Sequence, residues 1–148
     1  MHTQDLYVQN TQQIISAEWS LISSLDLCHS SLRPQTASLL AQGKWPLLQT
    51  LDLACTGLGP KGLAELVKGK WPHLQVLCLH SCLLNAEAMA YFSLADWPKL
   101  RDLSLGDNNL ELETFAASEG AYVNVWTRDG GFAAITELVK CNWPTLRN

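Results

Sequence analysis

Tryptophan recurs at a fixed interval along this chain of 148 residues. Trp19, Trp45, Trp71 and Trp97 each differ from the next by 26 in residue number, and Trp143 follows after a further 46. A fixed period of roughly 20–50 residues is typical of repeat proteins, in which a unit buries its apolar face only by stacking on its neighbours. The sequence therefore predicts an array of similar units.

Each unit repeats one pattern of leucines after its tryptophan. Positions +3, +6, +8 and +13 hold leucine in every unit but for one isoleucine: Ile22, Leu25, Leu27 and Leu32; Leu48, Leu51, Leu53 and Leu58; Leu74, Leu77, Leu79 and Leu84; Leu100, Leu103, Leu105 and Leu110. The alternation at +6 and +8 has the period of a strand and puts both leucines on one face. We expect short strands near 23–28, 49–54, 75–80 and 101–106.

The second half of each unit has a helical pattern. Leu63, Leu66 and Val67 are spaced as on one face of a helix. Equivalent segments predict helices near 8–17, 34–43, 60–69, 86–95 and 131–141. Because strand and helix alternate, we expect the α/β class, with a parallel sheet on one side and helices on the other. The tryptophans, which end each helical stripe, are expected in the core.

The repeat resembles that of a known family. The run Leu48-x-x-Leu51-x-Leu53-x-x-Thr56-x-Leu58 is similar to the leucine-rich repeat signature, Leu-x-x-Leu-x-Leu-x-x-Asn/Cys-x-Leu. The resemblance implies a right-handed open solenoid, with the sheet on its concave side and the helices on its convex side. It implies that the residues at the Asn/Cys position hydrogen-bond the turn backbone; they are Ser30, Thr56, Cys82 and Asn108. Unit length and helical returns look most like the ribonuclease-inhibitor-like subclass, whose members are mostly intracellular binding scaffolds.

Charge and composition exclude several classes of partner. The net charge is −4, so the chain has no basic field for nucleic acid or for anionic lipid. No apolar run approaches the roughly 20 residues that cross a bilayer. Five cysteines, an odd number, and the absence of an Asn-x-Ser/Thr motif favour a reducing compartment. We therefore expect a cytoplasmic protein that binds neither nucleic acid nor membrane.

The domain organisation follows from the frame of the repeat. We expect one domain over 1–148, a window from a longer array whose uncapped ends could associate end to end. The interval before Trp143 is longer than one unit, and the surplus predicts an insertion at 111–130 within the last repeat, in the connection from strand to helix. This segment carries a net charge of −3. A binding loop, an inert loop and a gene-model artefact remain open as explanations.

Two motifs suggest other chemistry. Gly57, Gly59 and Gly62 match the G-x-G-x-x-G pattern of dinucleotide sites, but neighbouring units lack these glycines and no acidic ribose partner follows. The set of Cys78, His80 and Cys82 suggests a metal site, but alternation puts the third residue on another face. We expect no cofactor, no metal site and no catalytic residues.

The expected function is that of a protein–protein interaction scaffold. The resemblance makes the concave sheet face the docking surface, by analogy of fold. Candidate partner-binding residues on that face are Asp26, Asp52, His80 and Asp102, and the insertion adds Tyr122 and Trp126. The alternative is a regulatory or substrate-recognition part of a larger enzyme, a GTPase activator or a ubiquitin-ligase receptor.

Overall fold

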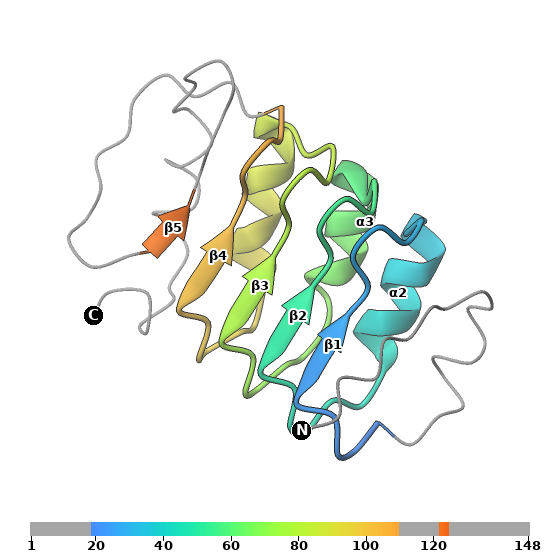
Figure 1. Ribbon diagram of the computed structural model, residues 1–148, viewed down its shortest axis with the longest axis vertical. Coiled ribbons are helices and arrows are strands. Elements are labelled where there is room, and N and C mark those ends of the chain that lie inside the picture. Colours follow the sequence, from blue (N-terminus) through green and yellow to red (C-terminus); the bar gives the residue numbers. More distant parts are fainter. Residues whose placement is uncertain (1–18, 110–121, 125–148) are drawn as a thin grey trace.

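The computed structural model describes residues 19–109 and 122–124, and within them the chain forms a parallel sheet backed by helices (Figure 1). The order of the strands in the sheet is their order in the sequence, β1-β2-β3-β4-β5. Their bounds are Ser24–Asp26 for β1, Thr50–Asp52 for β2, Val76–Cys78 for β3, Asp102–Ser104 for β4 and Tyr122–Asn124 for β5. The α/β class with a parallel sheet is confirmed.

The register of the sheet reproduces the period of the sequence. Leu25 pairs with Leu51, Leu51 with Leu77, and Leu77 with Leu103, so neighbouring strands are related by one full repeat along the chain. The central leucine of each strand is buried, and the residue on either side of it is half-buried. The pleat therefore separates an apolar face from a more polar one.

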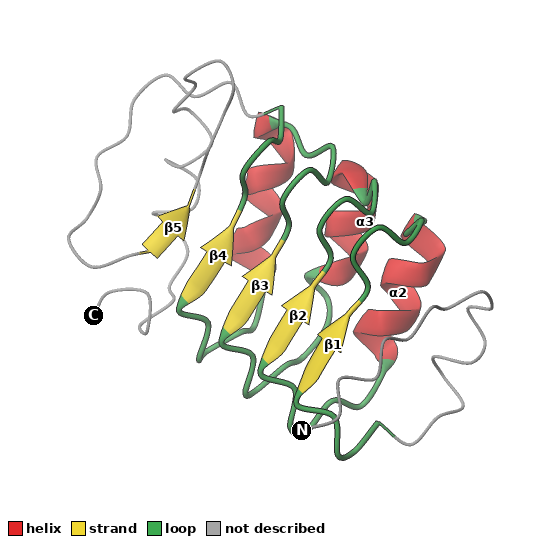
Figure 2. Cartoon of the chain, in the orientation of Figure 1, coloured by secondary structure: helices red, strands yellow, loops and turns green. Residues whose placement is uncertain are grey.

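All the helices of the described part lie on the same side of the sheet (Figure 2). They are α2 (Pro34–Gln42), α3 (Gly59–Leu66) and the 3₁₀ helix η1 (Ala86–Leu94). Proline in the first turn of α2 and of α3 supplies a φ angle suited to a helix start.

The third helix differs from the other two in type. Ala88, Met89 and Phe92 are buried on η1, and Ala86 and Ala95 pack against the core, so the positions 86, 89, 92 and 95 form a row of every third residue and Ala88 is buried beside it. A 3₁₀ helix has three residues per turn and aligns such positions on one face. Where the preceding unit has the buried Val67, just after α3, this unit has the exposed Ser93.

The repeated leucines form the core, as the sequence predicts. All those at +6, +8 and +13 within the described residues are less than a tenth exposed, and Ile22 at +3 packs against them from a half-buried position. Leu110, the last of the set, lies outside the described residues.

The tryptophans at the start of each unit are core residues too. Trp19 stacks on Trp45 with ring centroids 5.6 Å apart, and Trp71 stacks on Trp97 at 5.4 Å. The indole of Trp45 donates a hydrogen bond to the Leu40 carbonyl at 2.8 Å. A Cβ atom at Gly43 would lie 2.5 Å from that indole nitrogen, so the ring occupies the space that glycine leaves. Trp143 lies outside the described residues.

The observed elements correct the expected ones at two points. Strands are three residues long rather than six, because the backbone turns soon after the second leucine of each pair. The expectation that 111–130 lies wholly in a connection is wrong at Tyr122–Asn124, which pairs with β4. Val123 and Val125 repeat the alternation of the leucines, and the edge of β4 offers unpaired backbone groups. The expected helices at 8–17 and 131–141 lie outside the described residues.

Replacing Leu77 by alanine should destabilise the protein by about 2–5 kcal/mol, the usual range for truncating a buried leucine. Leu77 is fully buried at the centre of β3. Urea unfolding followed by circular dichroism measures the change in free energy. His80→Ala serves as the control, because the His80 side chain is 41% exposed and should contribute little to stability. A loss below about 0.5 kcal/mol for Leu77→Ala would contradict its place in the core.

Two stacked tryptophans differ in hydrogen bonding, which gives a matched pair of variants. The Trp97 indole donates to the Gly69 carbonyl at 3.1 Å, whereas the buried Trp71 indole nitrogen finds no hydrogen-bond partner among the described residues. Both changes to phenylalanine reduce the ring area and the stacking contact, but only Trp97→Phe also removes a hydrogen bond. Trp97→Phe should therefore cost about 1–2 kcal/mol more than Trp71→Phe. Equal losses in thermal or urea unfolding would contradict this difference.

Candidate functional site

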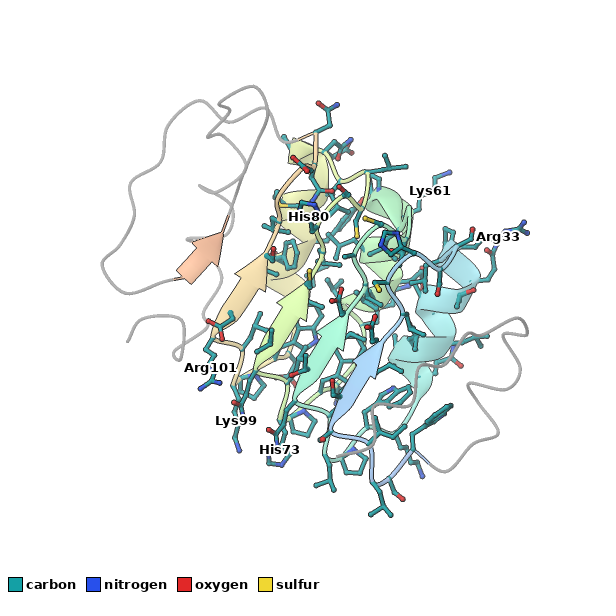
Figure 3. All side chains as sticks on the ribbon, viewed as in Figure 1. Arg33, Lys61, His73, His80, Lys99 and Arg101 are labelled. Atoms are coloured by element: carbon teal, nitrogen blue, oxygen red, sulfur yellow. The ribbon has the colours of Figure 1, made fainter. Side chains whose placement is uncertain are left out.

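The face of the sheet that points away from the helices is the candidate site, and we call it the open face (Figure 3). It is made of the residues that flank the buried central leucines of β1 to β4. One row holds Ser24, Thr50, Val76 and Asp102, and the second row holds Asp26, Asp52, Cys78 and Ser104. All eight side chains are short and half-buried, so no long side chain of the two rows obstructs the approach of another molecule.

Asp26 and Asp52 end neighbouring strands and are register partners. The Oδ1 atom of Asp26 accepts the backbone N–H of Cys28 at 2.9 Å, and Oδ1 of Asp52 accepts that of Ala54 at 2.9 Å. The Cys28 backbone N–H, followed by its thiol, lowers the pKa of Asp26 below its usual value. Asp26 therefore stays ionised down to acid pH.

Asp102 and His80 differ from that pair because each has a basic or acidic side chain beside it. Nε of Arg101 lies 3.4 Å from Oδ2 of Asp102, and Nε2 of His80 lies 3.3 Å from Oδ2 of Asp107. Tyr122 is the register partner of Asp102, so the structure brings these two candidates together. Trp126 lies outside the described residues.

A row of side chains at +2, just before the strands, went unnoticed in the sequence; three of its four members are exposed and His73 is half-buried. Its members are Leu21, Leu47, His73 and Lys99, and we call it the +2 rim. Leu21 is 85% exposed and Leu47 is 46% exposed. Nζ of Lys99 lies 2.9 Å from Nδ1 of His73, and Figure 3 shows both side chains at the same edge of the sheet as Arg101. The signal was a leucine outside the core pattern in two consecutive units.

The turn after each strand has a conformation that the sequence did not reveal. The residue at +10 has a positive φ angle in all four units: His29 (59°), Cys55 (56°), Ser81 (52°) and Asp107 (52°). Three of them, His29, Cys55 and Ser81, donate their backbone N–H to a carbonyl in the next unit. No residue type marks the position, and glycine, the usual signal, is absent there.

The polar residues at +11 are used inside the protein. Asn108 donates through Nδ2 to the carbonyl groups of Leu79 at 2.8 Å and Leu105 at 2.9 Å. Its Oδ1 accepts the backbone N–H of Cys82 at 2.9 Å. Thr56 donates to the Leu53 carbonyl at 2.7 Å, and Cys82 donates to the same carbonyl at 3.0 Å. The expected hydrogen bonds to the turn backbone are confirmed for these three residues, which stabilise the fold.

Three of the cysteine thiols, those of Cys28, Cys78 and Cys82, have a raised pKa, which favours the protonated form. Hydrogen bonding to the Asp26 carboxylate raises the pKa of Cys28 to about 11, and burial raises the pKa of Cys78 and of Cys82. Because a nucleophile or a metal ligand must be a thiolate, these environments suit neither role. Residues 19–109 contain no group of three histidine, cysteine or acidic side chains placed to hold a metal ion.

The glycines of the G-x-G-x-x-G pattern have structural explanations. Gly57 and Gly59 have φ angles of 64° and 65°, which favour glycine. A Cβ atom at Gly62 would lie 2.6 Å from Cδ1 of Leu58, so close packing of the helix explains the third glycine.

No family model matches the chain, and no curated protein matches it. In the part of the chain that the structure describes, no helix is long and apolar enough to cross a membrane.

Replacing Asp26 by asparagine should make Cys28 more reactive toward iodoacetamide. The Asp26 carboxylate is the main cause of the raised pKa of Cys28. At a pH below this pKa, each unit by which the pKa of Cys28 falls increases its thiolate fraction about tenfold. Alkylation rates at pH 8, resolved by peptide mass spectrometry, measure the change. Cys78 is the internal control, because Asp26 is not among the causes of its shift. An unchanged rate at Cys28 would show that this carboxylate does not hold the thiol.

Proposed function

We propose that this chain is part of a leucine-rich repeat protein of the ribonuclease-inhibitor-like subclass, a right-handed open solenoid that binds another protein on its concave sheet face. The constant register between β1, β2, β3 and β4, one full repeat at each step, supports the repeat architecture. The hydrogen-bonded residues at +11 support it as well, since they occupy the Asn/Cys position of the signature.

A single observation carries the proposed binding role: helices cover one face of the sheet, and the open face lies uncovered in the described part. Its short side chains leave the backbone of the sheet accessible over several neighbouring strands. An extended polar face with accessible carboxylates suits docking of a protein partner better than enclosure of a small molecule, which requires a concave and mostly apolar site.

The proposed location is the cytoplasm, and the proposed role is binding without catalysis. Cys28, Cys55, Cys78 and Cys82 are free thiols, as expected in a reducing compartment. The acidic net charge argues against nucleic acid and anionic membranes as partners. End-to-end association through further repeats is a second mode of contact that this architecture allows.

Charge reversal at Asp52 should weaken capture of the partner, because Asp52 lies in the middle of the open face on β2. Affinity purification with quantitative mass spectrometry compares the wild type, Asp52→Lys and Glu65→Lys. Glu65 lies on α3, on the helical side of the protein, and Glu65→Lys is therefore the matched control.

We expect at least about a tenfold loss of the captured partner for Asp52→Lys, as for truncated charged contacts in interfaces, with circular dichroism unchanged. Equal capture by all three proteins would contradict binding on the open face. Capture of an intact enzyme complex would instead favour the alternative, in which the array is a regulatory or substrate-recognition part of a larger enzyme.

A further inference from the structure

Asp26 and Asp52 form a pair of like charges that the described part of the protein does not neutralise. They are register partners on adjacent strands, which lie about 4.8 Å apart in a sheet. Neither carboxylate forms an ion pair within residues 19–109, where the ion pairs are Lys68–Glu65, His80–Asp107 and Arg101–Asp102. A cation from another molecule can therefore pair with both carboxylates.

The two halves of the open face therefore differ in charge. Over β1 and β2 neither carboxylate has an ion-pair partner in the described part, whereas near β3 and β4 Arg101 pairs with Asp102 and the His80 ring lies 3.3 Å from Asp107. The +2 rim adds Lys99 and His73 beside β4 and β3. A basic ligand is attracted to the first half and disfavoured at the second.

The same half carries the exposed leucines of the +2 rim. Leu21 precedes β1, and Leu47 precedes β2, so they occupy equivalent positions in consecutive units. Each lies five residues before its aspartate, a stretch that spans at most about 17 Å when fully extended. An apolar surface thus lies at a short distance from the carboxylate pair.

We propose that the β1–β2 half of the open face binds an extended polypeptide segment carrying an arginine or lysine side chain and, within about five residues of it, a large apolar side chain. This inference rests on the proposed function and names the chemistry of the partner. The cationic group lies between Asp26 and Asp52, and the apolar side chain packs on Leu21 and Leu47. Arginine fits best, because its planar guanidinium donates to two carboxylates at once.

Selection from a phage-displayed library of random dodecapeptides, with the full chain as the target, tests the proposal. Enriched peptides should combine a basic and a large apolar residue. One enriched peptide is then synthesised in two forms, with arginine and with citrulline, its uncharged isostere, and the affinity of each is measured by isothermal titration calorimetry. The citrulline form should bind at least about tenfold more weakly, and the arginine form should weaken as salt increases.

Two double variants locate the site. Asp26→Asn with Asp52→Asn should reduce affinity for the arginine peptide at least about tenfold, and Leu21→Ser with Leu47→Ser should also reduce it. Glu65→Gln with Glu87→Gln changes the net charge by the same amount on the helical side, and should leave the affinity within about twofold.

The outcomes separate this inference from the function on which it rests. Peptides that need neither Asp26 nor Asp52 but are blocked by Cys78→Arg would overturn the inference and leave binding on the open face intact. Peptides that bind equally to all these variants would overturn both. A selection that enriches no peptide over background would overturn the inference.

Discussion

The register between neighbouring strands is the constraint on which the rest of the structure depends. Because each unit shifts the pairing by one full repeat, identical positions meet across the sheet, and the central leucines of β1 to β4 are buried in one row. A slip by a single position would exchange the two faces of a strand. The stacked indoles Trp19–Trp45 and Trp71–Trp97 fix the same spacing at the beginning of the units. Core, turns and open face are consequences of this repetition.

The register also decides which polar residues are available for binding. Thr56, Cys82 and Asn108 face the turn backbone and are saturated by hydrogen bonds within the protein. Asp26 and Asp52 are oriented by one backbone N–H each and keep their charge on the open face. Polar side chains of the first kind maintain the fold, whereas those of the second kind remain available to another molecule.

Much of the fold could be predicted from the sequence because leucine is usually buried, so the positions of the leucines indicate which face of each strand lies in the core. The rows from Leu25 to Leu103 follow from period and alternation alone, and so does the side on which the helices lie. The positive φ angles at +10 could not be predicted, because histidine, cysteine, serine and aspartate share no signal for them. Strand β5 was missed because Val123 replaces leucine and follows its register partner Leu103 at less than one full repeat. The balancing of Asp102 by Arg101 required side-chain geometry.

Urea unfolding of a variant with one alanine inserted between Gln75 and Val76 tests the register most directly. The insertion lies at the start of β3 and moves Leu77 and Leu79 relative to β2 and β4. Gln75→Ala is the control, because it adds the same side chain without changing the register. The account predicts that the insertion abolishes cooperative unfolding while Gln75→Ala stays close to the wild type. An insertion variant that unfolds cooperatively within about 0.5 kcal/mol of the wild type would contradict it.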